Sequence, residues 1–168
     1  RSRRARRIAL LPAAMIDSLV SSAAILTDVK ASTKDAALKE LLLAAQTAGI
    51  VAKKSATVLG KKLLEREAIG STGLGNGVAV PHIKHADIAA SSLVLARTST
   101  PIEWQAIDGR PVSIMFLVVS PAADPEAHLQ CLRWISTLAR NADFRRFLLD
   151  AKDETAIRDL LRELSPKS

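Results

Sequence analysis

The chain has 168 residues, of which 48% are hydrophobic and 24% are charged, with two Trp, three Phe and no Tyr. This length is typical of one domain, and no apolar stretch approaches the roughly 20 residues that a membrane span needs. The scarcity of aromatic rings argues against a protein that stacks nucleic-acid bases. The single cysteine, Cys131, excludes an internal disulfide and fits a cytoplasmic location.

The formal net charge of +7 is concentrated at the N-terminus, where residues 1–7 read RSRRARR. Without residues 1–14, 19 basic and 17 acidic residues remain, so the rest of the chain is nearly neutral. We expect residues 1–14 to be a basic extension, either disordered or left by an over-extended reading frame. Met15 opens a segment typical of a natural start, and residues 15–168 are expected to form the domain. No nucleic-acid partner is expected for this folded part.

The predicted elements begin with a short strand at Ile25–Val29, followed by a helix that Ser32-Thr33 can cap and that reaches Gly49. A second helix is expected over roughly Ala52–Glu67. Later strands are expected at Val78–Val80, Ser92–Arg97 and Val112–Val119, and Pro81 ends the first of them. Between the second and third of these strands, residues Pro101–Trp104 are expected to be extended and Asp108-Gly109 to form a turn. Three helices complete the chain, at about Asp124–Arg140, Asp143–Leu149 and Glu154–Leu164.

The run VSIMFLVV at Val112–Val119 is the strongest strand signal. A continuous apolar run of this length is typical of a strand that helices bury on both faces. The sequence therefore predicts an α/β fold, a single domain with a mixed β-sheet flanked by helices on both faces.

Four of the seven glycines lie in the segment GSTGLGNGVAVPH, which ends at His82. Glycine lets backbone N–H groups approach a ligand closely, so Gly73, Gly75, Asn76 and Gly77 are candidates for a phosphate-cradling loop. Two nucleotide-binding patterns fail here. Asn76 and Gly77 stand where a P-loop needs Lys and Ser/Thr, and the GxGxG spacing leads into a strand instead of a helix.

His82, His85 and Asp87 form an HxxHxD cluster, and histidine is a common metal ligand. In an extended segment His82 and His85 point to opposite faces, and His85 lies in a predicted surface turn. We therefore expect neither a metal site nor a cofactor.

His128 is predicted to lie in the first turn of a helix, because Asp124 can be the N-cap and Pro125 the first helical residue. A helix N-terminus favours anions. If His128 faces His82, the two rings enclose a space that suits a phosphoryl group on one imidazole, with Arg66 supplying the balancing charge. The alternative is that His128 is a residue at the edge of the core and Arg66 an ordinary surface arginine.

These segments resemble a known family. The stretches REAIGSTGLGNGVAVPH, IEWQAIDGRPVSIMFLVVSP and EAHLQCLRWISTLA are similar, in order and spacing, to the type-2 enzyme IIA domain of the bacterial phosphotransferase system, from about Met15 to Leu164. The resemblance implies phosphorylation of His82, with His128 beside it as a stabiliser and Arg66 holding the phosphate. Ile83 departs from the pattern, since many members have glycine after the Pro-His pair.

The resemblance implies a cytoplasmic phosphocarrier that accepts its phosphoryl group from the histidine phosphocarrier protein HPr. His82 then either passes the group to a IIB component in sugar transport or controls a regulatory target protein by its phosphorylation state. The chain shows no fused IIB, IIC or HPr segment, which favours the regulatory form. The alternative is a non-catalytic binding module whose basic N-terminal arm contacts nucleic acid or a membrane.

Overall fold

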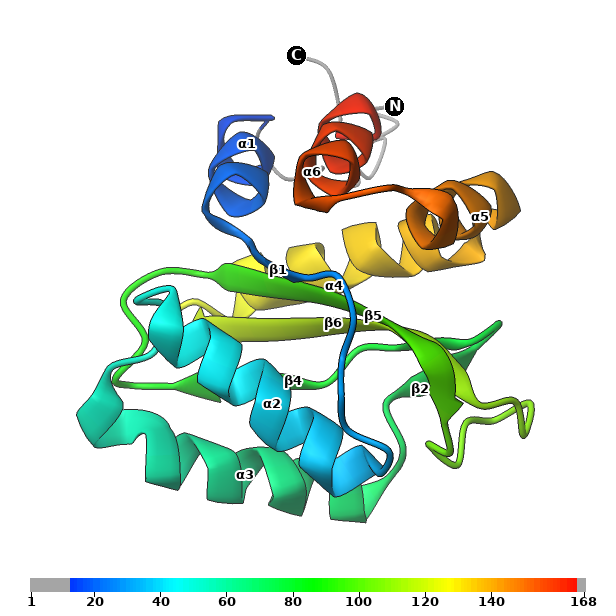
Figure 1. Ribbon diagram of the computed structural model, residues 1–168. Helices are drawn as coiled ribbons and strands as arrows, with labels where there is room; N and C mark the ends of the chain where they lie inside the picture. The colour runs from blue at the N-terminus through cyan, green and yellow to red at the C-terminus, as the bar shows by residue number, and fades with distance from the viewer. Residues whose placement is uncertain (1–12, 166–168) are drawn as a thin grey trace, which may run out of the picture.

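Two layers of helices enclose a six-stranded mixed sheet in the computed structural model, which describes residues 13–165 (Figure 1). The strand order is β1-β5-β6-β3-β2, and β4 also pairs with β6. Strand pairs β2–β3 and β5–β6 are antiparallel, whereas β1 runs parallel to β5, and β3 and β4 run parallel to β6. The strands are β1 (Ala24–Leu26), β2 (Gly73–Gly75), β3 (Val78–Ala79), β4 (His82–His85), β5 (Ser92–Ile102) and β6 (Val112–Pro121).

The helices divide between the two faces of the sheet (Figure 1). One face carries α1 (Ala13–Ser22), α4 (Pro125–Arg140), α5 (Ala142–Asp150) and α6 (Glu154–Glu163). The other face carries α2 (Lys34–Thr47) and α3 (Ala56–Ile69), the latter preceded by the 3-10 turn η1 (Lys53–Ser55). The predicted fold class, a mixed sheet with helices on both faces, is confirmed.

The alternation of side chains along β6 builds two separate cores. The α4 side receives Ile114, Phe116 and Val118. The α2–α3 side receives Met115, Leu117 and Val119. The same alternation applies to β4, which pairs with β6 in register. Ile83 belongs to the α2–α3 core, so the side chain of His82 projects to the side of α4.

Most predicted elements are observed within a few residues of their expected bounds, including β5, β6 and the three C-terminal helices. Three elements differ from the prediction. The first is β2, a short strand at Gly73–Gly75, where a loop was expected. Helix α1 occupies a segment to which the sequence analysis assigned no element, and its first two residues lie within the predicted 1–14 extension. Residues 1–12, which hold the rest of that extension, lie outside the described residues.

The strand pairing also continues past Pro81, where we expected it to stop. β4 begins at His82, and the Val118 N–H donates to the Pro81 carbonyl at 3.0 Å. Proline is tolerated here because Pro81 directly precedes the first residue of β4 and its carbonyl can still accept from β6. His85 is accordingly the last residue of β4 and is half-buried, instead of lying in an exposed turn.

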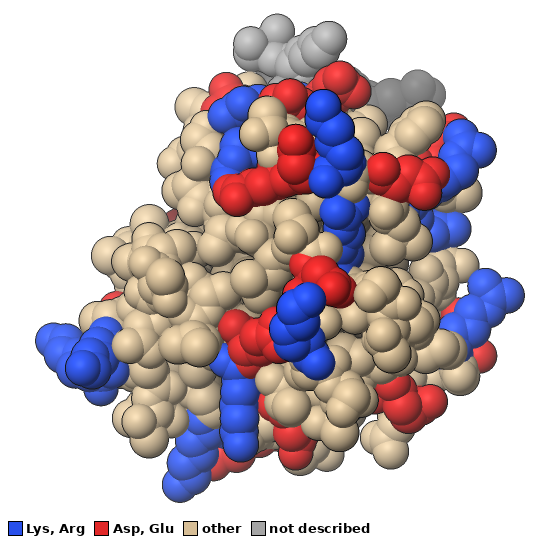
Figure 2. Space-filling view, in the orientation of Figure 1, with Lys and Arg blue, Asp and Glu red and all other residues tan. Residues whose placement is uncertain are grey.

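Acidic and basic side chains intermingle on the face of the molecule shown in Figure 2, with no single basic patch. This distribution agrees with the nearly neutral charge of the chain beyond its arginine-rich start. Among the helices in residues 13–165, none is long and apolar enough to cross a membrane.

Candidate functional site

His82 lies at the start of β4 with its two ring nitrogens in different environments. Its Nδ1 is 2.7 Å from the carbonyl oxygen of Val80. A carbonyl can only accept, so Nδ1 carries the proton of the neutral ring and Nε2 keeps the free lone pair. Burial lowers the pKa of His82 below its usual 6.5, and the positive charge of Arg66 lowers it further, although the bond to Val80 acts in the opposite direction.

His128 faces His82 from the first turn of α4, as the sequence analysis predicted. Asp124 caps this helix by accepting from the Ala127 N–H, and Pro125 is at its start. The two imidazole ring centroids are 5.5 Å apart, and the ring planes are inclined by 52°. His128 is 5% exposed, and burial, followed by the charges of His82 and Lys84, lowers its pKa to about 4. Both rings are therefore neutral at pH 7.

Arg66 lies in the last turn of α3, where its Nη1 donates to the Gly70 carbonyl at 3.0 Å. Its charge lowers the pKa of His82, so the guanidinium is within electrostatic reach of that ring. The structure thus places His82 of β4 beside His128 of α4, with Arg66 of α3 within electrostatic reach of His82. Their roles in catalysis stay predictions.

The glycine-rich loop forms the β2–β3 hairpin. Asn76 and Gly77 are its central residues, with φ angles of 55° and 76°, the left-handed conformation that Asn-Gly favours in two-residue hairpin turns. The Asn76 N–H donates to Asp108 Oδ2 at 2.9 Å. This backbone donor thus binds a carboxylate of the same chain. The role of Gly73, Gly75, Asn76 and Gly77 as a phosphate cradle stays a prediction.

The third histidine, His85, lies apart from this arrangement. Its Nδ1 accepts from the Asp87 N–H at 3.0 Å, and Asp87 in turn accepts from Ser55 Oγ at 2.9 Å. Across residues 13–165 there is no group of three or more His, Cys, Asp or Glu residues placed to hold a metal ion.

A buried ionic network behind His82 was missed in the sequence analysis. Glu67 has a side chain that is 4% exposed, and its carboxylate contacts Lys34 Nζ at 2.8 Å. It also accepts from the N–H and the hydroxyl of Thr72, at 2.8 and 2.7 Å. A buried carboxylate is costly unless it is paired and hydrogen-bonded, and Glu67 is both.

The network reaches His82 through the backbone. The carbonyl of Thr72 accepts from the Val80 N–H at 3.0 Å, and the carbonyl of Val80 holds the His82 ring. The sequence offered little signal for this role. Lys34 opens a helix 33 residues before Glu67, and a charged residue near a helix end is normally solvated.

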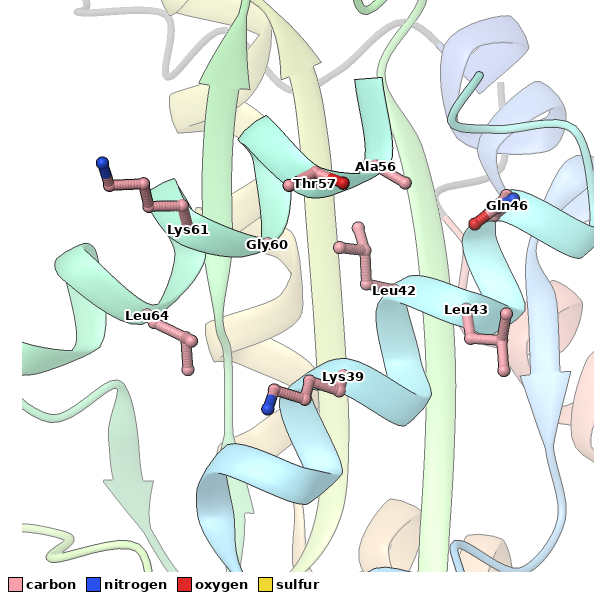
Figure 3. Close-up of a pocket in the computed structure, with 9 residues that line it drawn as sticks. All are labelled: Lys39, Leu42, Leu43, Gln46, Ala56, Thr57, Gly60, Lys61 and Leu64. Atoms are coloured by element: carbon pink, nitrogen blue, oxygen red, sulfur yellow. The ribbon is translucent and has the colours of Figure 1, made fainter. Parts of the chain in front are cut away.

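A separate groove of about 500 Å³ lies between α2 and α3 (Figure 3). The side chains on its floor are largely aliphatic. Gly60 leaves room for one of them, because a Cβ at this position would lie 3.2 Å from Leu42 Cδ2. None of the predicted site residues lines this groove, and α2 and α3 cover the face of the sheet opposite to α4. The lining residues are Lys39, Leu42, Leu43, Gln46, Ala56, Thr57, Gly60, Lys61 and Leu64.

The chain is similar to proteins of one family in both sequence and structure. It is 35% identical over 133 residues to a fructose-specific EIIA component of the phosphotransferase system (PTS) from Haloferax volcanii, covering 79% of this chain and 85% of the relative. It is 36% identical over 146 residues to a nitrogen regulatory protein from Bradyrhizobium diazoefficiens, covering 87% of this chain and 94% of the relative.

A crystal structure of the nitrogen regulatory protein IIA-Ntr from Neisseria meningitidis superposes with a TM-score of 0.73 at 28% identity, over 86% of this chain and 99% of that one. The family model for "Phosphoenolpyruvate-dependent sugar phosphotransferase system, EIIA 2" matches residues 18–164. The chain therefore belongs to the type-2 EIIA family of the phosphoenolpyruvate-dependent phosphotransferase system.

Proposed function

We propose that this protein is a phosphohistidine phosphoryl carrier whose acceptor atom is Nε2 of His82. The observation that carries the proposal is that the two nitrogens of that ring have different hydrogen-bonding environments. Nδ1 is held by the Val80 carbonyl at 2.7 Å, so Nε2 is the nucleophilic nitrogen. The ring of His128 lies beside it, 5.5 Å away between centroids, and Arg66 acts on it electrostatically.

The transfer itself requires positioning more than acid–base chemistry. The bond between His82 Nε2 and phosphorus forms as the bond between phosphorus and the donor's nitrogen breaks, and the donor nitrogen recovers its electron pair. The His82 ring gains positive charge as this happens. The Nδ1–H···O bond to Val80 then becomes charge-assisted and stabilises the product. Arg66 balances the charge on the phosphoryl oxygens.

The expected donor is phospho-HPr, which would dock on the surface around His82. One exposed aliphatic side chain supports a protein–protein contact there. Leu129, 42% exposed, directly follows His128. Apolar residues in such positions are typical of contact surfaces.

The phosphoryl group then has two possible uses, because the relatives include both a fructose-specific EIIA component and nitrogen regulatory proteins. Either His82 passes the group to a IIB component, or its phosphorylation state controls a target protein. Mixing the phosphorylated protein with a IIB component separates the two uses. Rapid loss of the label to IIB supports transport, and retention of the label supports regulation.

The test is labelling from radioactive phosphoenolpyruvate with enzyme I and HPr, using the full chain. The wild type should acquire acid-labile, base-stable label, and His82→Ala should acquire none. The control is His85→Ala, which removes a histidine three residues away that contacts Asp87 and should label like the wild type. Undiminished label in His82→Ala would move the acceptor elsewhere.

The same assay examines His128 and the alternative function. His128→Ala should still label, but about 100-fold more slowly, the usual effect of losing one group that stabilises transition-state charge. Complete loss of label in this variant would instead make His128 a candidate acceptor. An unlabelled wild type would favour the binding module, whose salt-sensitive binding to nucleic acid or membranes should disappear when residues 1–14 are removed.

A further inference from the structure

We propose that Ser120 is a positioning residue that fixes the tautomer of His128, so that His128 presents an Nε2–H donor to the phosphoryl group. The catalytic part of this inference rests on the proposed function, whereas the tautomer can be measured independently of it. The inference concerns a short chain of hydrogen bonds, Ser91–Ser120–His128, that ends at the second histidine of the site.

Ser120 is a polar residue at the end of the most apolar strand of the protein. It follows Ile114, Phe116 and Val118 in the alternation of β6, which directs its side chain to the α4 side of the sheet. The residue is fully buried, and its Oγ lies 2.7 Å from His128 Nδ1. Ser91 Oγ donates to the same oxygen at 3.2 Å.

Counting protons along this chain determines the state of His128. Ser120 Oγ already accepts from Ser91, and its own proton is buried and needs an acceptor. His128 Nδ1 is the acceptor within reach. If Nδ1 carried a proton while Ser91 donates, Ser120 would accept twice and leave its own O–H unpaired, which is costly in a buried position. With Ser91 as the donor, Nδ1 is therefore unprotonated, and the neutral ring has its proton on Nε2.

The reversed chain, in which His128 donates to Ser120 and Ser120 donates to Ser91, would have a different consequence. His128 Nε2 would then carry a lone pair beside the free lone pair of His82 Nε2. Two bare lone pairs repel the oxygens of a phosphoryl group, whereas one lone pair and one N–H give an acceptor for phosphorus and a donor for its oxygens. The forward chain is thus the one that suits phosphoryl transfer.

The direct test is NMR spectroscopy of the full chain labelled with 15N-histidine, in which the ring nitrogen shifts report the tautomer. At pH 7 the wild type should show His128 with Nε2 protonated and Nδ1 unprotonated. In Ser120→Ala the ring should gain a substantial Nδ1–H population, because nothing then donates to Nδ1. A wild-type ring protonated on Nδ1, or a Ser120→Ala ring that stays entirely Nε2–H, would overturn the inference.

The kinetic test compares Ser120→Ala with the matched control Ser92→Ala, whose hydroxyl donates to the Ala90 carbonyl at 3.1 Å. Ser120→Ala should slow labelling of His82 roughly tenfold through kcat, the size of one lost hydrogen bond. The KM for phospho-HPr should be unchanged, because Ser120 is fully buried and does not contact the donor. Ser92→Ala should match the wild type.

The outcomes distinguish this inference from the proposed function. In one outcome the wild type is labelled on His82, and Ser120→Ala has the same His128 tautomer and the same labelling rate as the wild type. This outcome refutes the role of Ser120 and leaves the proposed function intact. A wild type that never labels refutes the proposed function and leaves the tautomer to be decided by NMR. If Ser120→Ala fails to fold, the wild-type spectrum still decides the tautomer. Ser91→Ala, at a half-buried position, should then weaken the preference for Nε2–H without abolishing it.

Discussion

His82 and His128 differ from free imidazole because the protein buries both rings. Desolvation is the main cause of the lowered pKa at each ring. The next contribution at His128 is the charge of His82. For a nucleophile this environment is useful, because only the unprotonated nitrogen can attack phosphorus.

An NMR titration of the folded protein should therefore show the pKa of both site histidines below the usual 6.5, with the larger shift at His128. The midpoint of His128 should lie at about 4, and that of His82 below 6.5. The reference is the same protein unfolded in urea, where both should titrate near 6.5. A folded-state midpoint for His82 at or above 6.5 would contradict the account of its burial.

At the scale of elements, the β2–β3 hairpin is fitted closely to the loop between β5 and β6. A Cβ added at Gly73 would lie 2.7 Å from Ala106 Cβ and 2.9 Å from Ala106 Cα. Asp108 in the same loop accepts from the N–H groups of Asn76 and Arg110. The hairpin that leads to His82 is thus fixed by close packing of Gly73 against Ala106 and by the hydrogen bond from the Asn76 N–H to the Asp108 carboxylate.

Gly73→Ala should consequently destabilise the protein by about 1–3 kcal/mol, since the backbone at Ala106 cannot yield as a flexible side chain could. Urea unfolding measures this change. The matched control is Gly70→Ala, three residues earlier, where an added Cβ meets nothing within 4 Å and the backbone is extended. Equal stability of the two variants would show that the contact with Ala106 is not tight.

At the scale of the whole molecule, the candidate site is assembled from α3, β4, β6 and α4. Some of these elements and residues could be predicted from the sequence and others could not. Arg66, His82 and His128 could be named as candidates because each lies in a segment with a clear motif, and β6 was predicted because it is continuously apolar. Helix α1 was missed because the residues around Met15 were interpreted as a start of translation. Strand β4 was missed because HIKH has a single buried residue, Ile83, and follows a proline.

The supporting residues could not be found from the sequence for a different reason. Lys34 and Glu67 are charged and lie on separate helices, so neither pattern nor composition indicates that they pair in the interior. Ser120 and His128 are eight residues apart and on different elements, and only their packing brings the hydroxyl to the ring. Such contacts depend on tertiary structure, which local sequence patterns do not encode.

The lowered histidine pKa values also predict how the whole molecule responds to acid. Below pH 6.5 the unfolded chain takes up protons at His82 and His128 that the folded protein does not bind, so stability falls as the pH decreases toward about 4. The lowered pKa values of Asp28 and Asp108 act mainly at lower pH, because these groups are half protonated in the unfolded chain only near pH 3.8.

Urea unfolding at pH 7, 6 and 5 should therefore show a steady loss of stability in the wild type. His128→Gln should show a smaller loss over the same range, because glutamine does not titrate. His85→Gln is the control for removing a histidine outside the site. A His128→Gln variant that loses as much stability as the wild type would place the acid-sensitive group elsewhere.

The central position of β6 has a consequence for the order in which the protein is made. Both β3 and β4 pair with β6, yet β6 is synthesised after them, and α4 with His128 comes later still. A chain still emerging from the ribosome therefore holds His82 and Arg66 before it has the strand that aligns them or the ring that faces them. On the proposed function, incomplete chains carry the acceptor histidine without competing for phosphoryl groups, and charging begins only when α4 has packed against the sheet.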